Sequence, residues 1–187
     1  NLQLVSGMFR QQIDLNDGGP QDRLRSIAQR VMSLAKIYDH LLGNGLSRTI
    51  DFDQYVRSLC DSLSAFQSNR EFHVILTCEG KATPLLLDLD SVTALGIVIA
   101  EIVSNAYTHA FPGRVGEIRV ALTRTASGAV LVIGDDGIGF AEPPISKRHG
   151  LGLVRRLMEQ IGGAVRVVSD QGTEWTLAFP MIAERAA

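Results

Sequence analysis

A strand-like run that ends in a carboxylate and two spaced glycines places the strongest constraint on how this chain can fold. Residues 129–133 are apolar throughout and predict a buried strand, and the hexapeptide Asp-Asp-Gly-Ile-Gly-Phe follows at residues 135–140. This arrangement puts a carboxylate at a strand end, next to backbone that is free to take positive φ and to approach a ligand closely. Because an ordinary Asp-Gly turn has the same appearance, the interpretation depends on three other stretches.

The first of these stretches is a long apolar helix predicted over residues 91–111. Glu101, Asn105 and His109 follow one another at intervals of four residues, so they form one polar ridge on a helix that is otherwise almost uncharged. A polar ridge is usually a solvated face, but on a largely buried helix we interpret it as facing a ligand. The expected buried stripe of this helix consists of Val92, Leu95, Ile99, Ile102 and Ala106.

Two glycine-containing stretches farther along the chain also predict ligand contacts. The sequence His-Gly-Leu-Gly-Leu-Val at residues 149–154 opens a helix that we expect to reach about residue 161, and free N–H groups at a helix N-terminus suit a phosphate. Gly172 and Thr173 precede a predicted strand over residues 174–179, where the hydroxyl can bond a base or simply continue the strand. Each stretch is common when it is taken alone.

In this order, the four stretches resemble the N, G1, G2 and terminal Gly-Thr boxes of the Bergerat ATP-binding fold, over about residues 70–180. Sensor histidine kinases, gyrase, Hsp90 and MutL share that fold. The wording Asn-Ala-x-x-His-Ala-Phe-Pro at residues 105–112 is most similar to the bacterial histidine kinase subclass whose acceptor box is His-Arg-x-Lys-Asn-Asn-Leu-Gln, a relative of the HWE kinases. The chain begins Asn1-Leu2-Gln3, which matches the end of that box, and residues 30–42 resemble its second helix.

The resemblance implies that one end of the domain binds adenine. Asp135 is expected to accept a hydrogen bond from the exocyclic amine, which guanine lacks at that position, and Thr173 is expected to support this contact. Gly137 and Gly139 are expected to let the backbone approach the base and ribose.

The resemblance also implies a phosphate and Mg²⁺ site. Asn105 is the expected Mg²⁺ ligand and His109 an added phosphate contact. The segment of residues 141–148 contains the basic pair Lys147 and Arg148, and it is expected either to close over the phosphates or to be a solvated loop. The phosphate-binding residues implied by the basic pair and the G2 box are Lys147, Arg148, Gly150, Leu151, Gly152 and Leu153. Thr108 stands where many such kinases have Lys, which removes one phosphate contact that Lys147 or Arg148 can replace.

Glu101 admits two interpretations. An acid at this position activates water in the ATPase relatives, whereas in the kinases it can orient or deprotonate the acceptor imidazole, and we expect the second, accessory catalytic role. The structural alternative is a charge that simply pairs with Arg119.

Two amphipathic helices are predicted upstream, over residues 1–15 and 20–42. Such a hairpin cannot close a core alone, so we expect residues 1–45 to form a four-helix bundle in a homodimer, the dimerisation and phosphotransfer element of the resembled family. The alternative is a hairpin that packs on its own ATP domain. The predicted acceptor histidine precedes Asn1, and none of His40, His73, His109 and His149 stands in the acceptor box.

Residues 50–182 are expected to form the ATP-binding domain. Asp51 should cap a helix over residues 52–67, and strands are predicted at 71–78, 84–87, 117–123, 129–133, 163–169 and 173–179. The expected fold class is therefore α+β: a helical hairpin followed by an α/β sandwich, in which helices cover one face of a mixed sheet.

Composition narrows the range of partners and compartments. The net charge of −2 gives no reason to expect nucleic-acid binding. Cys60 and Cys78 lack metal-binding spacing and suit a reducing cytoplasm. No apolar run is expected to approach the length of a membrane span, so this fragment, which lacks an initiator Met, is expected to have no direct membrane contact.

The sequence therefore predicts the catalytic core of a cytoplasmic or membrane-linked sensor histidine kinase that uses ATP and Mg²⁺ and signals to a response-regulator receiver domain. The alternatives are a phosphotransfer scaffold with a degenerate ATP domain, and an ATPase of the gyrase or chaperone type in which Glu101 activates water.

Overall fold

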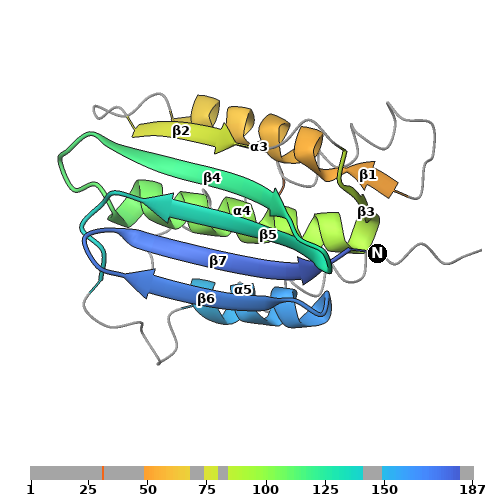
Figure 1. The fold of residues 1–187 in the computed structure, drawn as a ribbon. Coiled ribbons are helices and arrows are strands. Elements are labelled where there is room, and N and C mark those ends of the chain that lie inside the picture. The colour runs from red at the N-terminus through yellow and green to blue at the C-terminus, as the bar shows by residue number, and fades with distance from the viewer. Residues whose placement is uncertain (1–30, 32–48, 68–73, 80–83, 141–148, 182–187) are drawn as a thin grey trace, which may run out of the picture.

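The computed structural model describes residue 31 and residues 49–67, 74–79, 84–140 and 149–181. A five-stranded sheet forms one layer, and three helices cover one of its faces (Figure 1). The elements are β1 (Thr49–Asp51), α3 (Phe52–Gln67), β2 (Val74–Glu79), β3 (Leu86–Asp88), α4 (Leu89–His109), β4 (Gly116–Arg124), β5 (Gly128–Asp135), α5 (His149–Gln160), β6 (Ala164–Ser169) and β7 (Thr173–Pro180). This arrangement confirms the α+β class and the helices on one face.

The sheet is mixed, as predicted. Its strand order is β2-β4-β5-β7-β6; β2 runs parallel to β4, and the other neighbours are antiparallel. Both predicted hairpins, β4–β5 and β6–β7, are present. The strand predicted at 84–87 overlaps β3, but its pairing with β1 in a small separate sheet was not predicted, because the three-residue β1 carries too little periodicity to stand out.

Local capping sets where two of the helices begin. The Asp51 carboxylate accepts hydrogen bonds from the backbone N–H groups of Asp53 (3.1 Å) and Gln54 (3.4 Å), which confirms the predicted cap of α3. The Asp88 carboxylate accepts from the N–H of Ser91 at 2.6 Å. This cap starts α4 at Leu89, two residues earlier than the sequence suggested.

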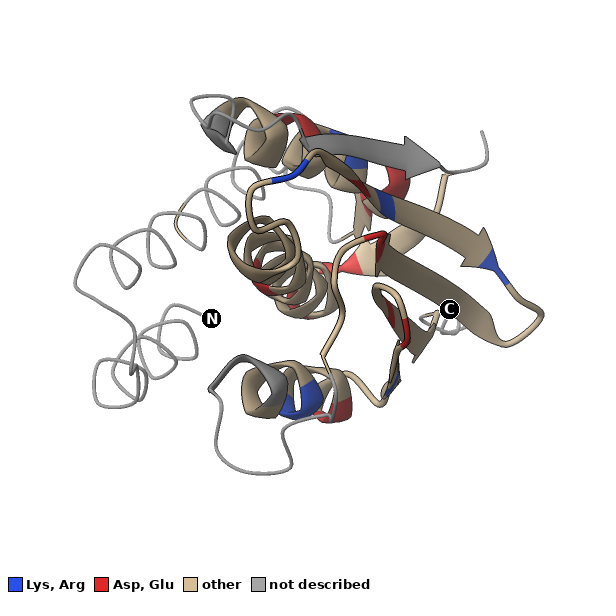
Figure 2. Cartoon of the chain, turned by 90° about the vertical axis from the view of Figure 1, so that its left-hand side faces the viewer, with Lys and Arg blue, Asp and Glu red and all other residues tan. Residues whose placement is uncertain are grey.

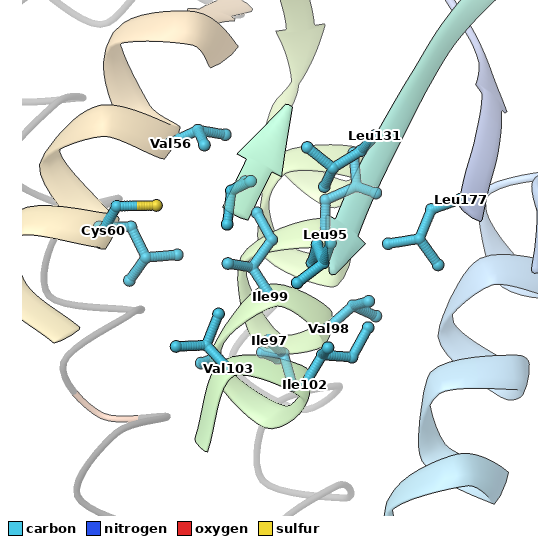
Figure 3. Close-up of a cluster of buried hydrophobic side chains, with 14 of the residues drawn as sticks. Val56, Cys60, Leu95, Ile97, Val98, Ile99, Ile102, Val103, Leu131 and Leu177 are labelled. Atoms are coloured by element: carbon cyan, nitrogen blue, oxygen red, sulfur yellow. The ribbon is translucent and has the colours of Figure 1, made fainter. Parts of the chain in front are cut away.

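The apolar face of α4 forms the centre of the core. Figure 3 shows Leu95, Ile99 and Val103 among side chains from α3 and from the strands, with Leu131 and Leu177 contributed by β5 and β7. Every member of the predicted stripe is buried. Burial of each large aliphatic side chain stabilises the fold by about 1.5–3 kcal/mol, so α4 is the main attachment between helices and sheet.

One expectation was wrong: an apolar run long enough for a membrane span does occur. Helix α4 has 21 residues, a mean hydropathy of 1.4 over an 18-residue window, and 61% of that window buried inside the domain. A helix that is apolar nearly all round also suits a position between a sheet and two flanking helices, and that is where α4 lies.

Several predictions lie outside the described residues. They are the helices at 1–15 and 20–42, apart from Val31, the first residues of the strand at 71–78, and the basic pair Lys147 and Arg148. Val31 is helical and 52% exposed in this single chain. The division into residues 1–45 and 50–182 therefore stays a prediction.

Candidate functional site

Three polar residues lie next to one another at one end of the sheet. Asp135 ends β5, Thr173 begins β7 and Ser169 ends β6, and the register pairs Asp135 with Thr173 and Thr173 with Ser169. These three residues therefore form one row, with their side chains on the same face. Leu177, on the same side of β7 as Thr173, is fully buried in the core, so the row faces the helices.

The Asp135 carboxylate is held by its neighbours. It accepts a hydrogen bond from the backbone N–H of Gly137 at 3.0 Å, and both the backbone N–H and the hydroxyl of Thr173 donate to it. Burial raises the pKa of the Asp135 carboxyl; the hydrogen bonds from Gly137 and Thr173 oppose this shift, and the charge of Asp136 adds to it. The result is a half-buried, firmly oriented acceptor.

The start of the glycine-containing loop is fixed to β4. Asp136 donates its N–H to the Glu117 carbonyl at 3.2 Å, and its side chain accepts the Glu117 N–H at 2.7 Å. The Arg114 guanidinium donates to the Asp136 carbonyl at 2.8 Å and lies 3.8 Å from its carboxylate. Asp136 therefore holds the loop in place, although its side chain is 59% exposed.

The middle of the same loop rests on the end of α4. The N–H of Ile138 donates to the Ala110 carbonyl at 3.0 Å. A Cβ at Gly137 would lie 2.4 Å from the Ala110 Cβ and 2.8 Å from an Asp135 carboxylate oxygen, so no larger residue fits. Gly139 has φ +63°, which glycine adopts without strain. Both glycines are therefore required by close approach or backbone conformation.

The polar ridge of α4 leads to this loop. Glu101 is half-buried, Asn105 and His109 are exposed, and His109 is followed directly by Ala110, which touches the loop. The C-terminal end of the ridge therefore lies beside the Asp135 row. Arg119, the proposed structural partner of Glu101, forms an ion pair with Glu117 at 3.6 Å.

Helix α5 begins at the same end of the domain. Its C-terminus joins β6 through a tight turn, in which the Gly163 N–H donates to the Met158 carbonyl at 2.8 Å. Because β6 ends in the Asp135 row and a 12-residue helix spans about 18 Å, the N-terminus of α5 returns toward that row. His149, Gly150 and Leu151 lie in its first turn, as predicted.

Two members of the predicted phosphate-binding box have different environments. Gly152 is exposed, whereas the Leu153 side chain is 5% exposed and belongs to the hydrophobic core. Leu153 can therefore offer a ligand only its backbone. Lys147 and Arg148, predicted beside this box, lie outside the described residues.

The charges of this end do not form a metal cage. Within the described ranges, no group of three or more His, Cys, Asp or Glu side chains can hold a metal ion. Figure 2 shows blue and red positions side by side on α5, where Arg155, Arg156 and Glu159 are exposed beyond the first turn of the helix. A metal here would need a ligand such as the exposed Asn105 together with oxygens of a bound molecule.

Sequence reasoning missed Asp136, Arg114 and Ser169. Their long-range hydrogen bonds join segments 19 to 29 positions apart, such as the bond between the Phe140 N–H and the Ser169 hydroxyl at 2.7 Å, which spans 29 positions. The only signal available beforehand was the predicted hairpin of strands 163–169 and 173–179; the register observed in the structure places Ser169 opposite Thr173.

Family models match both parts of the chain. The model described as "Histidine kinase-, DNA gyrase B-, and HSP90-like ATPase" matches residues 90–183, which is half of the chain, and a model described as "Histidine kinase" matches residues 1–67. The second match includes α3, which packs on β2 and α4 in the sheet domain.

Curated relatives are sensor kinases. The sensor histidine kinase PdtaS of Mycobacterium tuberculosis is 28% identical over 97% of this chain, and blue-light-activated histidine kinase 2 of Erythrobacter litoralis is 22% identical over 97%. The chain spans 37% and 54% of these relatives, respectively.

Solved structures with a similar fold include the histidine kinase domain of a blue-light-activated histidine kinase from Erythrobacter litoralis. Its TM-score is 0.72 at 20% identity, covering 83% of this chain and 75% of that one. Full-length ShkA in complex with AMPPNP has a TM-score of 0.57 at 20% identity, covering 87% and 37%. At these identities the likeness shows the fold alone.

Proposed function

Because the chain belongs to the family of histidine kinase-, DNA gyrase B- and HSP90-like ATPases, we propose that it is the catalytic core of a bacterial sensor histidine kinase. Such a core binds Mg-ATP and transfers the γ-phosphoryl group to a histidine of the helical hairpin, from which it passes to a response-regulator aspartate. The observation that carries this proposal is the Asp135 carboxylate, held by Thr173 and Gly137 at the end of the sheet.

Asp135 and Thr173 supply the recognition of adenine. The carboxylate has an orientation fixed by three donated hydrogen bonds, and a carboxylate has acceptor positions left for an exocyclic amine. A hydrogen bond to a charged group contributes about 1.5–3 kcal/mol. Guanine presents a carbonyl at that position and would repel the carboxylate, so the pair favours adenine over guanine.

The ridge of α4 and the start of α5 supply the phosphate end. Asn105 is exposed and offers a single amide oxygen, which suits Mg²⁺ because this ion keeps several waters and phosphate oxygens as ligands. Gly150, Leu151, Gly152 and Leu153 lie at the N-terminus of α5, and their backbone N–H groups are the donors that we assign to the phosphates. His109, Lys147 and Arg148 add positive or hydrogen-bonding contacts.

Glu101 acts on the acceptor rather than on ATP. It is half-buried two helical turns before His109, on the same ridge as Asn105. From there a carboxylate orients the attacking imidazole or accepts its proton as the phosphoryl group transfers. Bound Mg²⁺ would neutralise charge on the phosphate oxygens during this step.

The hairpin of residues 1–45 pairs with a second copy in a four-helix bundle, and residues 50–182 form the ATP-binding domain. The chain belongs to the HWE-related subclass, and its acceptor histidine stands in the box that ends in Asn1-Leu2-Gln3. The match of residues 1–67 to a histidine kinase model supports the hairpin assignment. The domain works in the cytoplasm, and its partner is a receiver domain.

The test is phosphoryl transfer in a chain extended upstream of Asn1 to include the predicted acceptor box. Incubation with ATP labelled at the γ-phosphate should label the protein at a phosphohistidine, which survives base and is lost in acid. The variant Asn105→Ala should lose the label, and Gln160→Ala, which changes an exposed amide on α5, should keep it. Release of free phosphate without labelled protein would contradict the kinase and favour the ATPase, and absence of ATP binding would favour the scaffold.

A further inference from the structure

The Ser169 hydroxyl joins two loops that are far apart in the sequence. It accepts a hydrogen bond from the backbone N–H of Phe140 at 2.7 Å and donates one to the Gly172 carbonyl at 3.0 Å. Phe140 closes the glycine-containing loop that begins after Asp135, and Gly172 ends the turn between β6 and β7. One side chain therefore fixes both backbone stretches that flank the Asp135–Thr173 pair.

The packing around this hydroxyl is tight. A Cβ at Gly139 would lie 2.7 Å from the Ser169 hydroxyl oxygen and 2.8 Å from the Gly172 carbonyl oxygen. A Cβ at Gly172 would lie 2.2 Å from the Asp135 carbonyl oxygen, and Gly172 has φ +130°. The two loops are thus in direct contact behind Asp135, with Ser169 as the polar link between them.

A hydroxyl suits this position because one donor and one acceptor are needed at once. Its single proton goes to the Gly172 carbonyl, and a lone pair receives the Phe140 N–H. Alanine would leave the half-buried Phe140 N–H without this acceptor, and among the described residues no other hydrogen bond joins the end of the glycine-containing loop to the sheet.

We propose that Ser169 is a positioning residue for nucleotide binding: it holds the end of the glycine-containing loop and the β6–β7 turn in the arrangement that the adenine site requires. This inference rests on the proposed function. It goes beyond the four sequence boxes, because Ser169 belongs to none of them and acts through Phe140 and Gly172 rather than on the ligand.

The effect on binding follows from preorganisation. Three sets of hydrogen bonds hold this loop. Those of Asp136 hold its start and that of Ile138 holds its middle, whereas the Ser169 hydroxyl holds its end. A loop that is already ordered loses less conformational entropy when it binds a ligand. Removing the anchor at Ser169 should therefore weaken nucleotide binding by about fivefold, the value expected for one lost hydrogen bond.

The test compares three variants by calorimetric titration of the purified chain with MgADP and with adenosine. Ser169→Ala should lower the affinity for both ligands about fivefold, because both contain adenine and the lost hydrogen bond lies at the adenine end of the site. Ser169→Thr keeps the hydroxyl and should restore affinity. Ser62→Ala is the matched control: it removes a hydroxyl bond to the Ser58 carbonyl at 2.9 Å on α3, away from the site, and should leave affinity unchanged.

Amide hydrogen exchange of the ligand-free protein gives a second readout that does not depend on nucleotide binding. The Phe140 N–H should exchange at least about tenfold faster in Ser169→Ala than in the parent chain, and at the parent rate in Ser62→Ala. Equal ligand affinities for the parent and Ser169→Ala would overturn this inference alone. A parent chain that binds neither ligand would overturn the proposed function and, with it, the role of Ser169.

Discussion

The substitution Thr173→Val isolates the hydrogen bond that orients the Asp135 carboxylate. Valine has the branched shape of threonine, so the buried side chain leaves no cavity, and the backbone N–H of residue 173 keeps its own bond to the carboxylate. Only the hydroxyl bond is lost. A bond to a charged acceptor contributes about 1.5–3 kcal/mol, and because Asp135 is partly solvated we expect a value near the lower limit, about 1.5 kcal/mol.

The loss should depend on pH, because the hydroxyl bonds the ionised carboxylate. This bond lowers the folded-state pKa of Asp135, so its contribution is present above that pKa and disappears as pH falls through it. Thr173→Val should therefore reduce the free energy of unfolding by about 1.5 kcal/mol at pH 8 and by much less near pH 4. Urea denaturation of parent and variant at both pH values measures this difference.

The control for this experiment is Thr93→Val. The Thr93 hydroxyl donates to the neutral Leu89 carbonyl at 2.6 Å, so its loss should cost the same at both pH values. If Thr173→Val also showed a pH-independent cost, the hydroxyl would not be bonded to the carboxylate, and the description of the Asp135 site would be refuted.

Three further predictions follow from the same contacts. Burial raises the pKa of Asp135 above its value in the unfolded chain, so the contribution of this carboxyl group to folding is favourable below the unfolded pKa of about 3.9 and is lost as pH rises through the folded pKa. Asp135→Asn should therefore raise the midpoint of thermal unfolding at pH 8, and a lowered midpoint would contradict this. Gly137→Ala introduces a Cβ 2.4 Å from that of Ala110 and should cost about 1–3 kcal/mol in urea unfolding together with a large loss of ATP affinity, whereas parent-like values would show that the loop can relax. Asp88→Ala removes the cap of α4 and should cost about 1 kcal/mol in urea unfolding without changing ATP affinity; an unchanged stability would show that the cap contributes nothing.

Patterns with a clear period were predicted well from the sequence. The stripe of α4 and the two hairpins follow hydrophobic periodicity and turn residues, and the helix over residues 52–67 was placed at its observed bounds because Asp51 and the apolar spacing agree. The pairing of Asp135 with Thr173 was expected only through the family resemblance, and the structure places the two side chains in contact.

The contacts that hold the site together could not be predicted, because they depend on how distant segments meet. Nothing in the sequence around Arg114 indicates that its guanidinium reaches the Asp136 carbonyl, and Leu153 lies in a phosphate-binding motif while its side chain packs in the core. The apolar length of α4 is a different case: its hydropathy can be read from the sequence and was underestimated, whereas the burial of 61% of its most apolar window inside the domain is visible only in the structure.

The central claim is that the Asp135 carboxylate recognises adenine. It is tested most directly by calorimetric titration of this chain with a non-hydrolysable ATP analogue and Mg²⁺, in parallel with the matching GTP analogue and with the Asp135→Asn variant. The account predicts that the parent chain binds the adenine nucleotide and not the guanine nucleotide, and that Asp135→Asn, while still folded, loses about tenfold or more in affinity. Equal binding of both nucleotides, or an unchanged affinity in Asp135→Asn, would contradict it.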